Sequence, residues 1–263
     1  MEDWKEPPVR LVPRDAGAVY CCTMDPTDIA PAIARRLAQV RADIAHIAQQ
    51  CGRRADDIRL IAVSKAMPPA YVAAAVAAGH CDFGENTLQD ALTKIPAFAQ
   101  QSLAWHFIGH VQSNKAKLIP GNFTWLHSLD SPGLAERLSR KAQETGAQLQ
   151  TLIEVNITRD PNKHGVSTQA LFPLLDELLR TPLPGIALRG LMAIGPHPAN
   201  DAEVGRAFAA LRMLRDAAAL RYALPGFSEL SMGMSGDYAA AIKEGSTMLR
   251  IGTAIFGERD YSK

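Results

Sequence analysis

An alternation, repeated eight times, between short apolar runs and helical stretches constrains the fold of this chain more than any other feature. Neighbouring parallel strands need a crossover connection, which is usually a helix. The runs are rich in β-branched residues and apolar throughout, as expected of strands that are covered on both faces. They occupy residues 58–64, 81–84, 105–108, 124–128, 150–157, 187–194, 229–233 and 247–252. The alternation predicts a parallel α/β fold.

Helical periodicity fills the intervals, for example at 69–78, 133–145, 168–180, 202–222 and 236–244. A further helix precedes the first strand; Thr27 or Asp28 can cap it, and it ends near Cys51 and Gly52. Eight such units close into one (β/α)8 TIM barrel, which takes about 250 residues as a single domain. A doubly wound sheet is the alternative, but no GxGxxG follows the first strand, so its dinucleotide-binding version loses support. We expect one barrel domain over 25–263 with an extra N-terminal helix.

Composition and net charge constrain the partners and the cellular compartment expected for this protein. Residues 1–24 hold three prolines and mixed charges without a period, so we expect a flexible extension there. A net charge of +1 gives no pull toward nucleic acid or membrane, and no apolar run approaches the roughly 20 residues of a membrane helix. The N-terminus lacks the apolar stretch of a secretory signal, and the four cysteines form no CxxC pattern. A reduced, cytoplasmic protein is the expectation.

A lysine stands where the first predicted strand ends. The segment AVSK at 62–65 places Lys65 at the C-terminal end of that strand, the face on which barrels collect their active sites. An amine in a pocket rimmed by apolar strands is desolvated, which lowers its pKa. The neutral amine is the nucleophile that forms a Schiff base with an aldehyde. A solvated lysine in a surface loop stays open as the alternative, because position alone does not decide.

Two glycine-rich segments, SMGMSGD at 231–237 and RIGTAIFG at 250–257, flank the last predicted helix. Barrels frequently bind phosphate in the loops after strands seven and eight, at the start of a short helix. Glycine lets the backbone approach the oxygens, and backbone N–H groups and small hydroxyls donate to them. Ordinary turns with helix caps are the alternative, since Ser235 can cap the helix that follows. The expected phosphate donors are Ser231, Ser235, Gly252 and Thr253.

Arg250 lies within the eighth predicted strand, where its side chain can point into the barrel mouth. A buried arginine is rare without a partner. Its guanidinium only donates hydrogen bonds, so a neutral pyridine nitrogen would be a suitable acceptor. An ion pair with Glu154 or another barrel carboxylate is the alternative.

His106 and His110 are four residues apart at a strand end, where the ligand spacing of a helix does not apply. We therefore expect no metal site at these histidines, and we place His106 near the barrel mouth.

Several further stretches carry a specific resemblance. They are AVSK at 62–65, FGEN at 83–86, WHFIGHVQSNK at 105–115, KHGV at 163–166, RGLMAI at 189–194, SMGMSGD at 231–237 and AIKEGSTMLRIGTAIFG at 241–257. In this order they resemble the pyridoxal phosphate homeostasis proteins, from about residue 27 to 261. The resemblance implies an alanine-racemase-like barrel, the fold type III of enzymes that use pyridoxal 5′-phosphate (PLP).

The resemblance also assigns roles to individual residues. Lys65 would hold PLP as a Schiff base, and Arg250 would face the pyridine nitrogen. The other implied cofactor-binding residues are Asn86, Ser231, Met232, Ser235, Gly252 and Thr253, with Met232 as pocket wall. The sequence departs from the family pattern at Thr87, where many members carry tyrosine, and at Ala66, where a hydroxyl or aromatic residue is common. Both departures affect the pocket rim.

The resemblance leaves three functions to compare. Racemisation needs two acid/base groups, and the chain ends at Lys263, soon after the eighth strand, without room for the domain that provides the second group in alanine racemases. An aldolase-like lysine enzyme needs an acidic neighbour, for which only Glu85 is a candidate. We therefore expect a protein of PLP homeostasis with no catalytic residue, a monomer that buffers the cofactor or delivers it to apo PLP-dependent enzymes. An amino-acid racemase of the same fold is the alternative.

Overall fold

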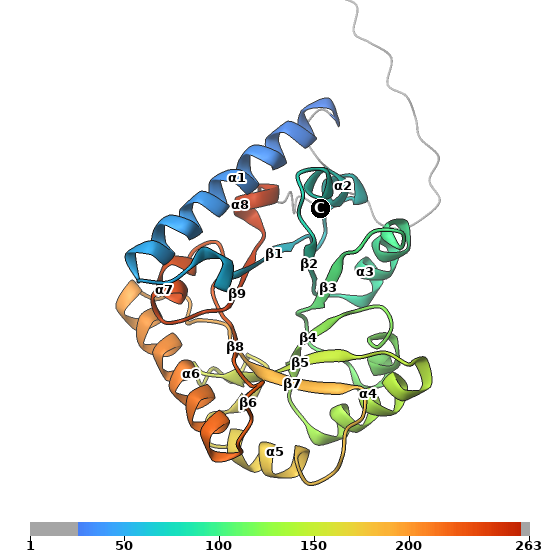
Figure 1. Ribbon diagram of the computed structural model, residues 1–263, viewed down its shortest axis with the longest axis vertical. Helices are drawn as coiled ribbons and strands as arrows, with labels where there is room; N and C mark the ends of the chain where they lie inside the picture. The colour runs from blue at the N-terminus through green and yellow to red at the C-terminus, as the bar shows by residue number, and fades with distance from the viewer. Residues whose placement is uncertain (1–25, 259–263) are drawn as a thin grey trace, which may run out of the picture.

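The computed structural model describes residues 26–258, and its centre is a closed barrel of parallel strands. The strand order is β4-β3-β2-β1-β9-β8-β7-β5, and pairing between β4 and β5 closes the ring, which Figure 1 shows in a view close to the barrel axis. Their bounds are β1 Arg59–Val63, β2 Asp82–Glu85, β3 Ala104–Phe107, β4 Trp125–Leu129, β5 Leu149–Asn156, β7 Ile186–Met192, β8 Glu229–Ser231 and β9 Met248–Ile251. The predicted single (β/α)8 barrel is confirmed.

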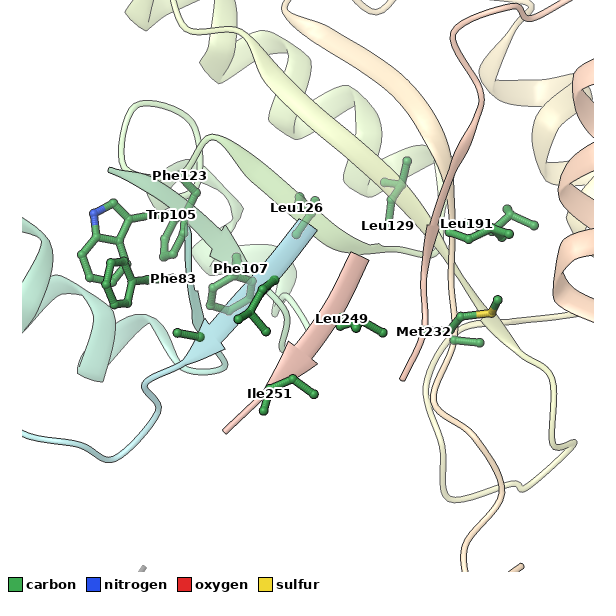
Figure 2. Packing of buried hydrophobic residues seen from close by; sticks show 14 of the residues in the cluster. Phe83, Trp105, Phe107, Phe123, Leu126, Leu129, Leu191, Met232, Leu249 and Ile251 are labelled. Carbon is green, nitrogen blue, oxygen red and sulfur yellow. The ribbon is translucent and has the colours of Figure 1, made fainter. Parts of the chain in front are cut away.

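Alternation along each strand sorts the side chains into an inner and an outer set, because successive residues of a strand point to opposite faces. The outward set packs against the surrounding helices and forms the main hydrophobic core; Figure 2 shows part of it, including Phe83, Leu249 and Ile251. The inward set is smaller and includes the cluster Ile61, Trp125, Leu152, Met192 and Met248. Polar side chains that share the parity of this inner cluster therefore lie inside the barrel.

Helices surround the ring (Figure 1). Helix α1, Pro26–Gln50, places one apolar face, from Ile33 through Leu37 to Ile44, in the core, where it lies against α2, α7 and α8. The other α-helices are α2 Pro69–Ala77, α3 Leu88–Lys94, α4 Pro132–Thr145, α5 Leu171–Leu178, α6 Asp201–Arg221, α7 Tyr238–Lys243 and α8 Thr253–Phe256. Short 3-10 turns span Ala55–Asp57, Ile95–Phe98 and Ser113–Leu118.

The predicted elements agree with these bounds to within a few residues, with three differences. Helix α1 is described from Pro26 onward, with Asp28 in its first turn, whereas the predicted cap at Thr27 or Asp28 places the helix start one or two residues later. The short strand β6, Val166–Ser167, pairs with the end of β5, and its two residues are too few to show a period. Helices α3 and α8 were not predicted, since neither exceeds seven residues. The extension expected at 1–24 lies outside the described residues.

Candidate functional site

Lys65 follows β1 in a turn at the C-terminal end of the barrel, and its side chain is partly buried. Ile61 points into the barrel, and the same alternation, carried past Val63, aims Lys65 toward the barrel axis. Ala66 takes a positive φ of 58°, which is uncommon for a residue with a side chain. Its backbone N–H donates to Oδ2 of Asp90 at 2.6 Å. The departure at Ala66 therefore sits in a constrained turn that α3 holds in place.

A second lysine, Lys94 at the end of α3, is fully buried behind this turn. Its Nζ donates to the backbone carbonyl of Ser64 at 2.7 Å, to Glu85 at 2.9 Å and to Asp90 at 2.9 Å. The Ser64 hydroxyl donates to the same Glu85 oxygen at 2.6 Å. Burial raises the pKa of Glu85 to about 7, against the opposing effects of Lys94 and Ser64. This ion-pair cluster, which the sequence analysis missed, ties β1, β2 and α3 together beside Lys65.

Asn86 follows β2 and is held by a close approach from the neighbouring strand. A Cβ on Gly109, at the end of β3, would lie 2.0 Å from the backbone oxygen of Asn86, so only glycine fits there. Beside it, the Thr87 hydroxyl accepts from Asp90 N at 3.4 Å and caps α3. Thr87 thus has a local structural role, and Asn86 follows β2, the strand that pairs with β1.

The loops that follow β8 and β9 meet at the same face of the barrel. The Ser235 hydroxyl accepts from the backbone N–H of Ala254 at 3.4 Å, at the start of α8, where Gly252 is the capping residue. Thr253 is exposed, and a Cβ on Gly236 would meet nothing within 4 Å. The cap of α7 is Asp237, so the alternative that Ser235 caps that helix is wrong. Ser235, Gly252 and Thr253 thus gather beside open space.

Arg250 is almost fully buried on the inner face of β9. Its Nη1 donates to the Ser231 hydroxyl at 2.6 Å and its Nη2 to the carbonyl of Ala193 at 3.0 Å. Burial lowers its pKa to about 10, while Asp237 and Glu154 act in the opposite direction. Among the described residues Arg250 forms no ion pair within 4 Å, so the ion pair with Glu154 is wrong as a description of its contacts. A guanidinium has five N–H donors, and these two bonds leave others for a ligand.

Two sequence expectations change at the end of β8. Ser231 was expected among the phosphate donors, yet its hydroxyl is fully buried inside the barrel, between Arg250 and His127. Met232 was expected in the pocket wall, yet its side chain points outward into the main core, as Figure 2 shows. The strand register causes both differences, because Ser231 shares the inward parity and Met232 takes the outward one. Ser231 therefore lies at Arg250, away from the loops around Ser235.

A carboxyl group and three histidines lie at this face of the barrel or inside the barrel. Glu154 of β5 lies inside the barrel, where burial raises its pKa to about 7 although Arg250 lowers it. The rings of His110 and His164 stack at 4.1 Å at the strand ends. His106 was expected at the mouth, but it is fully buried inside the barrel, bonded to Asp82 and His127. Within residues 26–258 no group of three or more potential ligands is arranged for a metal ion.

The chain matches the family model for the alanine racemase N-terminal domain over residues 36–260. It is 43% identical over 235 residues to a pyridoxal phosphate homeostasis protein from Vibrio cholerae, a match that covers 88% of this chain and 98% of the relative. The corresponding protein from Pseudomonas aeruginosa is 45% identical over 229 residues, 87% of this chain and 96% of the relative.

Solved structures agree with these relatives. PipY from Synechococcus elongatus with PLP bound superposes with a TM-score of 0.75 at 36% identity, over 86% of this chain and all of that one. An alanine racemase from Corynebacterium glutamicum, at 20% identity and a TM-score of 0.62, shares the fold over 88% of this chain and 62% of its own. On these matches, the chain belongs to the alanine racemase N-terminal domain family and, within it, to the pyridoxal phosphate homeostasis proteins.

Proposed function

We propose that this protein binds PLP at the C-terminal mouth of its barrel and serves PLP homeostasis, without dedicated catalysis of an amino-acid reaction. The observation that carries the proposal is the buried, donor-only Arg250, fixed on the inner wall beside the strand that leads to Lys65. A ring nitrogen that only accepts a hydrogen bond matches such a donor. The relative with PLP bound, PipY, supports the same cofactor.

Each residue of the mouth takes a separate part in holding the cofactor. PLP supplies an aldehyde, which an unprotonated amine can attack, and Lys65 supplies that amine. Ser235, Gly252 and Thr253 bind the phosphate through hydroxyl and backbone N–H groups at the start of α8. Asn86 lines the rim, while Ser231 acts through Arg250 and Met232 supports the β8 loop from the outer core.

The same geometry argues against efficient racemisation, which needs an acid/base group on each face of the substrate carbon. Tyrosine would be the expected second group. Among the three tyrosines within residues 26–258, Tyr222 donates to Asp176 and Tyr238 to Asp43 on outer helices, and Tyr71 is buried on α2 against Phe256. A guanidinium at the ring nitrogen also leaves the ring unprotonated and a poorer electron sink, which disfavours decarboxylation and transamination in particular. Both points favour a holder of PLP over a catalyst.

The role as a holder implies partners and a setting. We propose that apo PLP-dependent enzymes receive the cofactor in the cytoplasm, and that the carrier is a monomer. The eight barrel strands pair with one another around the ring, so within the described residues only the two-residue strand β6 has an unpaired edge, which supports the monomer. No helix among the described residues is long and apolar enough to span a membrane.

Two assays distinguish a PLP homeostasis protein from a racemase: transfer of PLP to an apo enzyme, and turnover of an amino acid. The loaded protein, freed of excess PLP, is mixed with an apo PLP-dependent enzyme, and recovered enzyme activity is followed over time. We expect reactivation faster than release of PLP into buffer alone, and negligible conversion of L-alanine to D-alanine by the pure protein. Efficient racemisation, or reactivation no faster than spontaneous release together with no PLP retained on the protein, would contradict the proposal.

A further inference from the structure

Four hydrogen bonds join five inward-facing side chains into one line through the barrel interior. Asp82 Oδ1 lies 3.0 Å from His106 Nε2, and His106 Nδ1 lies 3.0 Å from His127 Nε2. His127 Nδ1 lies 2.8 Å from the Ser231 hydroxyl, which Arg250 contacts at 2.6 Å. The line starts at the first residue of β2, at the N-terminal end of the barrel, and reaches the C-terminal end of β8. We call it the polar chain.

The two ends of the polar chain, together with the full burial of its two histidines, fix the direction of every bond in it. A carboxylate only accepts, so Asp82 receives the proton on His106 Nε2, and a guanidinium only donates, so Ser231 receives from Arg250. The Ser231 hydroxyl has a second lone pair, so by itself it could donate to His127 Nδ1 or accept from it. Donation by His127 would put a charge on one imidazole: on His127 if its Nε2 also donates, or on His106 if its Nδ1 donates while its Nε2 donates to Asp82. Both rings are fully buried, which disfavours either charge, so Ser231 donates to His127. His127 therefore carries its proton on Nε2 and donates it to the acceptor Nδ1 of His106. With both histidines neutral, donors and acceptors match at all four links in this direction alone.

The burial of His106 and His127 favours the neutral form of both rings. Both imidazoles are fully buried, and burial lowers the pKa of His106 and lowers that of His127 well below its usual value. The charge of His106 would be further disfavoured by Arg59 and that of His127 by Arg250, while Asp82 favours protonation of His106. At neutral pH the chain consequently has a single hydrogen-bond direction.

The polar chain cannot deliver a proton to the mouth, because it ends on an arginine that stays protonated. What it can do is hold a geometry. With its proton committed to His127, the Ser231 hydroxyl presents its lone pairs to Arg250, and the guanidinium plane is then set by Ser231 and the Ala193 carbonyl. Building on the proposed function, we propose that Asp82, His106 and His127 are positioning residues that orient Arg250 toward the ring nitrogen of PLP.

Two variants test this role on the full chain loaded with PLP. His127→Phe keeps a ring of similar size and frees the Ser231 proton, and Asp82→Asn acts at the far end, because an amide can also donate and so allows the chain to reverse. We expect PLP affinity to fall about 5- to 10-fold in each, the loss of roughly one net hydrogen bond. The absorption and fluorescence of bound PLP should shift in the direction that Arg250→Lys produces.

The matched control is Thr151→Val, which removes a buried hydroxyl of β5 that donates to the Leu149 carbonyl at 3.4 Å and takes no part in the polar chain. Its affinity and spectrum should match the wild type. If His127→Phe fails to fold, Asp82→Asn alone decides. A folded variant with wild-type affinity and spectrum would overturn the positioning role while leaving PLP binding intact. Absence of PLP binding in the wild-type protein would instead overturn the proposed function itself.

Discussion

Lys94 and Glu85 form an ion pair of 2.9 Å in which both side chains are fully buried. It lies directly behind the turn that carries Lys65, because Lys94 also donates to the carbonyl of Ser64. Taking two charges out of water is costly unless further hydrogen bonds offset it, and the second oxygen of Glu85, Oε2, is buried without a hydrogen-bond partner among the described residues. Here Lys94 makes three contacts, which supports a structural purpose: the pair fixes the end of β1 against α3.

Replacing Lys94 with methionine should remove this anchor and leave Glu85 without its cation. We expect the free energy of unfolding to fall by about 3–5 kcal/mol, the usual cost of breaking a buried pair on one side. Urea denaturation at pH 7 measures it. Lys117→Met, at an exposed position, is the control and should stay within about 0.5 kcal/mol of the wild type. Equal midpoints for the two variants would refute the structural role of Lys94.

Glu154 gives a pH-dependent prediction. Its pKa is raised from 4.5 to about 7 by burial, so the folded protein holds a proton that the unfolded chain releases above pH 4.5. The stability that this carboxyl contributes is therefore complete below about pH 4.5 and is lost as the pH rises toward 7. Glu154→Gln should be more stable than the wild type at pH 8, by about 1–3 kcal/mol, and should show no such gain at pH 4.5.

Denaturation of the PLP-free protein across this range checks the prediction. Glu136→Gln, at an exposed site on α4, is the matched control and should follow the wild type at every pH. A stability difference between Glu154→Gln and the wild type that stays constant from pH 4.5 to 8 would show that the carboxyl titrates at its ordinary value.

The close approach at Gly109 predicts a local effect on the rim. Alanine there would place Cβ 2.0 Å from the Asn86 oxygen, so β3 or Asn86 must move. We expect Gly109→Ala to lose about 1–3 kcal/mol of stability and to hold PLP less tightly than the wild type. Gly205→Ala, within α6 and with no atom within 4 Å of the added Cβ, should gain about 0.5–1 kcal/mol and keep its PLP. Equal PLP affinity in the two variants would show that the position of Asn86 does not affect PLP binding.

The barrel could be predicted because each strand leaves a separate apolar run, and because parallel strands need the helices between them. Lys65 and the loops after β8 and β9 followed from the rule that strand ends share one face. Arg250 was correctly expected to point inward, but its partners were not, since Ser231 and Ala193 come from other strands. Contacts across the ring depend on register, which a single strand does not encode.

Lys94 was missed for a different reason. In a short segment with Asp90 four residues earlier, a lysine has the pattern of an exposed helix pair. Only the packing of α3 against β2 removes it from water. His106 was placed at the mouth because it was assigned to a strand end, whereas its position within β3 and its inward parity place it inside the barrel. Burial and strand parity decided both cases.

The central claim is that Lys65 carries PLP at the barrel mouth, and the modified residue after reduction tests it most directly. The PLP-loaded protein is reduced with borohydride, digested, and mapped by mass spectrometry. We predict the label on Lys65, with Lys65→Ala losing the visible absorption band of the bound cofactor. A label on another lysine, or Lys65→Ala binding PLP with the wild-type band and affinity, would contradict it.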